Sequence, residues 1–180
     1  MSIPQNPKPV KLVISLFMKD KGLLHPVLTE LSKAFGHIDI ASPWFAFNFT
    51  DYYEPEMGVP LSRRVLAYKN LVQQYDIANI KFITNDFEHK FSKNGKRMVN
   101  IDPGYLGLER FVLATAKNYT HRICVGKGIY ADLTLIYTQG RFQPLPWTYP
   151  DYAEKGMITH LTRIRNKYIY DIGRKDMGNA

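Results

Sequence analysis

The stretch VKLVISLFM, Val10–Met18, is short, apolar and rich in β-branched residues. Such a run predicts a buried strand. The segment that follows predicts an amphipathic helix, opened by Gly22 and Pro26 and ended by Gly36. Its apolar residues recur at intervals of three and four positions, at Leu24, Val27, Leu28, Leu31 and Phe35. The first predicted elements are therefore a strand and an amphipathic helix.

The next hundred residues continue the alternation. Residues 37–49 are predicted to be extended, with Pro43 limiting them to an edge strand, a bulge or two short pieces. After a polar loop at 50–60, Arg63–Lys69 resembles a strand, Asp76–Ser92 a helix and Arg97–Ile101 another strand. The resulting order, βαββαβ, is the ferredoxin-like pattern.

The remainder is richer in β-strand signals. Strands are predicted at Arg122–Val125, Ile129–Thr138 and Arg141–Pro144, whereas Phe111–Ala116 fits either strand or helix. Asp151 and Glu154 have the spacing of a capping box before a closing helix. The fold class predicted is α+β, with a ferredoxin-like core, additional C-terminal strands and a closing helix.

Length and composition favour a single domain over residues 1–180, with a proline-rich arm at 1–9 and a flexible tail at 173–180. The net charge of +8 favours polyanionic partners such as RNA, DNA or nucleotides, although a basic surface needs no partner. One cysteine, Cys124, excludes an intrachain disulfide. With no signal peptide or membrane-length apolar run, we expect a cytoplasmic protein without a membrane partner.

Two acidic segments are candidates for chemistry. The block DYYEPEMG, residues 51–58, holds Asp51, Glu54 and Glu56, which could bind Mg²⁺ or Mn²⁺ or act as acid and base. Asp102 comes directly after a predicted strand, where it could be a metal ligand or a base. The alternatives are an exposed acidic loop and an ordinary Asp-Pro-Gly turn.

A basic, glycine-rich region could bind phosphate. It contains His121, Arg122 and the glycine-flanked Lys127, and Lys117 lies close by in sequence. Backbone beside glycine can approach a phosphate closely while an ammonium group neutralises it. The spacing is not that of a Walker A loop, and a hairpin turn explains the glycines equally well. Tyr130 or Trp147 could stack on a base, although the proline-rich stretch around Trp147 also fits a rigid connector.

Several blocks carry a family resemblance. They are DYYEPEMG, VNIDPGYL, LATAK, HRI, GKGIYADLTL and FQPLPWTYPDY. Together they resemble the signature blocks of a bacterial family known as domain of unknown function 4416, over residues 8–172. Some members carry the label GTP-binding protein, and this sequence lacks the phosphate loop of ordinary GTPases. The resemblance implies a bacterial cytoplasmic protein and transfers no catalytic residue.

The leading hypothesis is binding, or metal-assisted hydrolysis or transfer, of a phosphate-bearing small molecule, with a nucleotide favoured. Whether the protein is an enzyme stays open. The catalytic candidates are Asp51, Glu54, Glu56, Asp102 and His121, the first four also as metal ligands. The ligand-binding candidates are Lys117, Arg122, Lys127, Tyr130 and Trp147.

Two alternatives belong to other classes of protein. An RNA-binding module without catalysis predicts exposed aromatic residues on an open sheet face. A structural or interaction protein predicts buried aromatic and proline blocks with no substantial pocket beside them.

Overall fold

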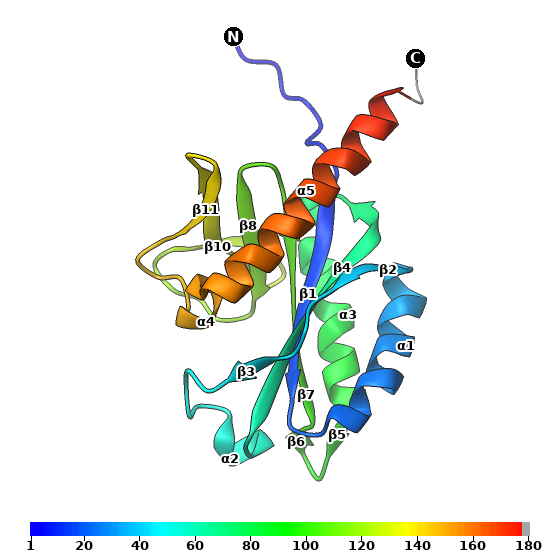
Figure 1. Cartoon of the computed structure of the whole chain (residues 1–180), viewed down its shortest axis with the longest axis vertical. Coiled ribbons are helices and arrows are strands. Elements are labelled where there is room, and N and C mark those ends of the chain that lie inside the picture. The colour runs from blue at the N-terminus through cyan, green and yellow to red at the C-terminus, as the bar shows by residue number, and fades with distance from the viewer. Residues whose placement is uncertain (178–180) are drawn as a thin grey trace.

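The computed structural model describes residues 1–177, with side chains described up to residue 173. Its core is a nine-stranded antiparallel sheet, to which helices are added on both faces (Figure 1). The strands are β1 (Val10–Met18), β2 (Ile38–Ala41), β3 (Phe45–Phe47), β4 (Leu61–Val72), β7 (Val99–Leu106), β8 (Arg110–Thr115), β9 (Arg122–Gly126), β10 (Ile129–Thr138) and β11 (Arg141–Pro144). A separate hairpin joins β5 (Ser92–Lys93) to β6 (Lys96–Arg97). The α-helices are α1 (Leu24–Phe35), α2 (Glu54–Met57), α3 (Ile77–Lys90), α4 (Pro150–Ala153) and α5 (Lys155–Met177), with 3-10 turns at Lys21–Leu23 and Gln74–Asp76.

β1 is the predicted buried strand, and all nine of its residues are buried. The reason is that both faces of the sheet are covered around it. Leu12, Ile14 and Leu16 pack toward α1 and α3, whereas Val13 packs toward α5 on the other face. Because side chains alternate between the two faces of a strand, a strand covered on both sides is mostly apolar, and the charge of the buried Lys11 is paired with carboxylates.

The strand order is β11-β10-β8-β7-β1-β4-β2, with β3 pairing β4 and β9 pairing β10. The protein is thus a mixed α and β structure with a large antiparallel sheet, larger than the predicted core. The segment left open between strand and helix forms β8 and joins the C-terminal strands to β7.

The helices divide between the two faces of the sheet. Figure 1 shows α5 crossing in front of the sheet, with α1 and α3 behind it. Both faces of the sheet are therefore covered around β1. Among the described residues, no helix is long and apolar enough to cross a membrane.

Several predicted elements differ in detail. The predicted strand at 97–101 runs instead from Val99 to Leu106, so Asp102 lies inside β7 and not at a strand end or a turn. In α3 the buried face includes Lys81, Thr84 and Glu88, while Ile83 of the predicted apolar stripe is exposed. The helix turns this polar face inward because it borders the cavity described below.

The C-terminal region also differs. Asp151 does not cap the closing helix, because it lies within α4 and forms a buried ion pair with Arg63. Glu154 has an extended conformation between α4 and α5. Of the predicted flexible tail, residues 173–177 belong to α5 and residues 178–180 lie outside the described part of the chain. Cys124 is a strand residue of β9, and it is exposed.

Candidate active site at the fork between β7 and β8

The sheet opens into a fork between β7 and β8. β7 pairs with β1 along its whole length, from Val99 to Leu106. It pairs with β8 only at its last three residues, 104–106. Gly104 allows this close approach, since a Cβ there would lie 2.4 Å from the Val112 carbonyl oxygen. β8 pairs with β10 along its whole length, but beyond Leu113 it no longer pairs with β7, and one edge of β7 is left open.

Side chains of α3 form hydrogen bonds with the backbone groups on the open edge of β7. The Ile101 N–H donates to Oε1 of Glu88 at 2.5 Å, and the Ile101 carbonyl accepts from Nζ of Lys81 at 2.9 Å. N–H groups of alternate residues point to the same side of a strand. The missing N–H of Pro103 therefore falls on this open side, where β8 offers no acceptor. On this edge, side chains of α3 pair with the backbone of Ile101, and Pro103 has no N–H that needs a partner. Both features avoid the cost of leaving a buried backbone group without a hydrogen bond.

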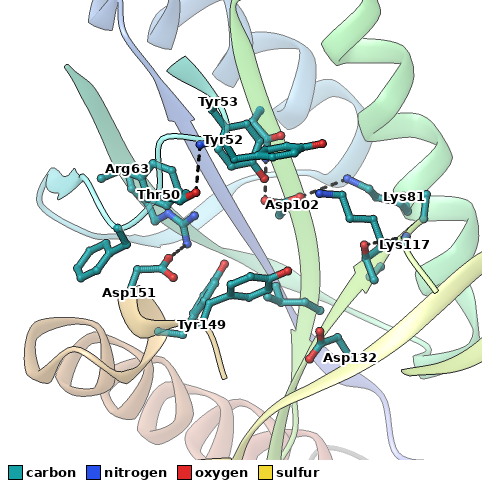
Figure 2. A pocket seen from close by; sticks show the side chains of 18 of the residues that line it. Thr50, Tyr52, Tyr53, Arg63, Lys81, Asp102, Lys117, Asp132, Tyr149 and Asp151 are labelled. Carbon is teal, nitrogen blue, oxygen red and sulfur yellow. Dashed lines mark hydrogen bonds and ion pairs between the residues drawn. The ribbon is translucent and has the colours of Figure 1, made fainter. Parts of the chain in front are cut away.

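A cavity of about 450 Å³ occupies the fork. Its walls come from the loop after β3, from α3, from β7 and β8, from the loop after β8, and from α4. Figure 2 shows Asp102 near its centre, with the side chains of Lys81 and Lys117 extending toward it and Tyr52 and Tyr53 beside it. This volume lies in the range of small-molecule sites.

A polar network surrounds Asp102. Its Oδ2 accepts from Nδ2 of Asn100 at 2.7 Å, and its Oδ1 lies 3.4 Å from Nζ of Lys81. Arg97 extends the network by donating to Oδ1 of Asn100 at 2.9 Å and to both carboxylate oxygens of Glu56. The carboxylate of Asp102 is thus oriented by two donors from different elements.

The opposite wall contains a second ion pair. Arg122 donates to Oδ2 of Asp132 at 2.8 Å, to the Lys117 carbonyl at 3.0 Å and to the Tyr149 hydroxyl at 3.1 Å. Nε2 of His121 lies 3.3 Å from the same Asp132 oxygen. Because its N–H groups are engaged, Arg122 holds the wall together and positions Tyr149.

Arg63 and Asp151 form a third pair at the inner end, where both are buried. The guanidinium of Arg63 also lies against the rings of Phe17, Phe47 and Tyr152, at 5.3, 4.5 and 4.9 Å. A cation among aromatic faces is stabilised by the ring quadrupoles. This pair joins α4 to β4 and holds the cavity wall that these two elements form.

Burial shifts the protonation of several cavity groups. It raises the pKa of Glu88 and the pKa of Asp151, and the lowering effects of Lys81 and of Arg63 respectively do not cancel it. Burial also raises the pKa of Tyr53, helped by the charge of Asp102. The cause is the cost of charge in a low-dielectric environment. The shifts of Glu88 and Asp151 disfavour the charged forms of these two carboxyl groups.

The predicted acidic set does not come together. Of the four predicted acidic residues, only Asp102 lines the cavity. Asp51 is exposed on the loop between β3 and α2. Glu54 and Glu56 border a separate shallow groove beside α2. The hydrogen bonds from Arg97 lower the pKa of Glu56 and occupy its carboxylate. Within residues 1–177, no cluster of three or more His, Cys, Asp or Glu residues is arranged to hold a metal ion.

The predicted basic and aromatic set divides. Lys117 and Arg122 line the cavity, and His121 lies behind the wall, stacked on Trp147 at 5.1 Å between ring centroids. Trp147 donates to the Leu133 carbonyl and so joins the wall to the connector. Lys127 lies at the β9–β10 hairpin, 3.4 Å from Oδ1 of Asn79, and Tyr130 lies within β10; neither lines the cavity.

Sequence reasoning missed several cavity residues. They are Arg63, Lys81, Glu88, Arg97 and Tyr149. A signal was present for two of them, because Lys81 and Glu88 are seven positions apart and share the helix face of Ile77 and Thr84. Charged residues on the inward face of a helix indicate a buried polar site. Arg63 and Arg97 lie on strands, where one charged residue gives no such pattern.

The comparisons with known proteins identify the family of the chain. No curated protein and no solved structure matches the chain. The family model described as domain of unknown function (DUF4416) matches residues 8–168, nearly the whole chain. The resemblance seen in the sequence blocks is confirmed, and the chain belongs to the DUF4416 family.

Proposed function

We propose that the cavity at the fork binds a small phosphate-bearing molecule, with a nucleotide favoured. The observation that carries the proposal is the position of Lys117. Its ammonium group lies at the cavity 4.2 Å over the Tyr52 ring, and among the described residues it pairs with no carboxylate. A cation on a cavity wall without an acidic partner is available to an anionic ligand.

The charge of the whole cavity supports an anionic ligand. Five cationic side chains line it, against four carboxylic ones. Burial raises the pKa of two of the four, Glu88 and Asp151, and so disfavours their charged forms. Clefts lined with an excess of one charge concentrate ligands of the opposite charge.

Aromatic side chains at the cavity support a ligand with a planar ring. Tyr52, Tyr119 and Tyr149 line it while remaining 62%, 53% and 46% exposed. Exposed rings beside a cation suit the stacking of a base next to its phosphate. We also infer a ferredoxin-like arrangement for residues 10–106, supported by the strand order β7-β1-β4-β2 and by α1 and α3 packing on one face.

Isothermal titration of the purified protein tests the proposal. The panel contains the common nucleoside mono-, di- and triphosphates, inorganic phosphate and a short single-stranded RNA. We expect at least one nucleotide to bind, and Lys117→Met to weaken its binding about ten- to a hundredfold, as expected when a charged hydrogen bond worth about 1.5–3 kcal/mol is lost.

Lys127→Met is the matched control, because Lys127 is also an exposed lysine but lies outside the cavity. Its nucleotide affinity should equal that of the unmodified protein. The proposal fails if no nucleotide binds at millimolar concentration, if the two lysine variants behave alike, or if only RNA binds.

A further inference from the structure

One carboxylate in the cavity is open to a ligand. The side chain of Asp102 is 31% exposed, whereas those of Asp132, Asp151 and Glu88 are 5%, 7% and 9% exposed. The other three lie within the walls, in ion pairs or bound to the backbone. A reacting group in this cavity can therefore meet Asp102 before any other acid.

Asp102 is also oriented and partly uncommitted. Asn100 contacts one of its oxygens and Lys81 the other, so each oxygen keeps capacity to accept a further hydrogen bond. Both neighbours are buried and held in turn, Asn100 by Arg97 and Lys81 by the Ile101 carbonyl. A carboxylate held in this way meets the geometric requirement for a general base.

We propose that Asp102 is the general base of a hydrolytic reaction on a nucleoside di- or triphosphate bound in the cavity. This inference rests on the proposed function. A water molecule beside Asp102 attacks the terminal phosphorus and forms a new P–O bond. The bridging P–O bond breaks, and its electron pair leaves on the oxygen of the shortened nucleotide.

Asp102 also accounts for the proton that the reaction releases. Asp102 takes the proton that the attacking water loses and releases it to solvent after the product leaves. The leaving oxygen belongs to a phosphate and departs as an anion, so no acid has to protonate it. The substrate carries its own Mg²⁺ on its phosphates, as nucleotides commonly do.

The other residues have supporting roles in this scheme. Lys117 neutralises charge on the phosphates, because its ammonium group lies at the cavity without a carboxylate partner. Asn100 and Lys81 are positioning residues, because they act on the ligand through Asp102.

The test measures release of inorganic phosphate from Mg²⁺-bound nucleoside di- and triphosphates, with affinity measured in parallel by titration. We expect Asp102→Asn to lower kcat by about a hundredfold or more, the usual contribution of a general base. Affinity should change little, because the amide keeps the shape of the side chain. Asp86→Asn is the control, since Asp86 is an exposed carboxylate of α3 outside the cavity, and its kcat should not change.

Asn100→Ala tests positioning separately from folding. We expect kcat to fall with KM unchanged, a division that a general loss of structure would not produce. Thermal unfolding of each variant shows whether it is folded.

The outcomes separate the two proposals. Binding without phosphate release by the unmodified protein overturns the role of Asp102 and leaves the binding proposal standing. Equal release by the unmodified protein and folded Asp102→Asn does the same. Absence of nucleotide binding overturns both proposals.

Discussion

Two buried lysines of this protein have opposite surroundings. Lys11 on β1 is fully buried and contacts Asp39 of β2 at 2.6 Å and Asp171 of α5 at 2.7 Å. Lys167 completes this group, contacting the same two aspartates. Lys81 on α3 is nearly as buried, but it has one carboxylate, Asp102 at 3.4 Å, and one backbone carbonyl.

The difference indicates that the group around Lys11 stabilises the fold, whereas Lys81 belongs to a candidate site. Around Lys11 two cations meet two carboxylates, and the group joins β1, β2 and α5 with its charges balanced. Beside Lys81 the pairing is looser, and a cavity takes the place of further partners. A saturated buried ion group stabilises a fold, whereas an incompletely paired one beside a cavity can contact a ligand.

The largest effect is expected at the saturated group. Lys11→Met leaves Asp39 and Asp171 facing each other with Lys167 alone, and it should lower the free energy of unfolding by about 3 kcal/mol. In a domain of this size the melting temperature should fall by roughly 6–12 °C. Lys33→Met, which alters an exposed pair with Glu30, should change it little. A melting temperature for Lys11→Met equal to that of the unmodified protein would show that the ion group around Lys11 does not stabilise the fold.

A smaller loss of stability is expected at the open edge of β7. Lys81→Met deprives the Ile101 carbonyl of its donor and should lower the free energy of unfolding by about 1–3 kcal/mol. The same variant should weaken nucleotide binding, because the cavity loses one of its cationic side chains. Chemical denaturation and titration measure the two effects. A loss of stability larger than that of Lys11→Met would contradict the conclusion that the group around Lys11 contributes more to the fold than Lys81 does.

Acid should act on the two regions in opposite senses. Burial alone would raise the pKa of Asp39 and the pKa of Asp171, but hydrogen bonds from Lys11 and Lys167 outweigh it and lower both. The native state then binds fewer protons than the unfolded state. This contribution to stability is present above about pH 4, the unfolded value for Asp, and is lost as the pH falls through the native values.

Glu88 has the opposite sign, because burial raises its pKa in the native state. Its contribution to stability should therefore diminish as the pH rises above its unfolded value of about 4.3. Denaturation midpoints between pH 3 and 7 measure both effects. Asp39→Asn should flatten the acid limb and Glu88→Gln the opposite slope; identical profiles for the two variants would contradict the assignment.

The smallest effect on stability is expected at Lys117. The residue is exposed, and its ammonium group lies over the Tyr52 ring and pairs with no carboxylate among the described residues, so Lys117→Met should change the free energy of unfolding by no more than about 0.5 kcal/mol. Binding should nevertheless weaken, as proposed above. A fall in the melting temperature as large as that of Lys81→Met would instead assign Lys117 to the architecture.

Part of the candidate site could be predicted from sequence. Asp102, Lys117 and Arg122 were among the predicted residues and line one cavity. The glycine-flanked Lys127 was predicted to bind phosphate, and Lys117, close by in sequence, was predicted to join it. The hairpin carries Lys127 away from the cavity. Residue type and local spacing contain no information about that direction.

The strand at Val10–Met18, the first helix and the family can be predicted without the structure, because apolar periodicity, chain breakers and distinctive blocks are local properties. Two other features become visible only in the three-dimensional fold. β8 pairs with only three residues of β7, and side chains of α3 hydrogen-bond the backbone groups on the exposed edge. These contacts join residues 13 to 20 positions apart across two elements. They follow from the need to pair buried backbone groups, which no single segment can meet alone.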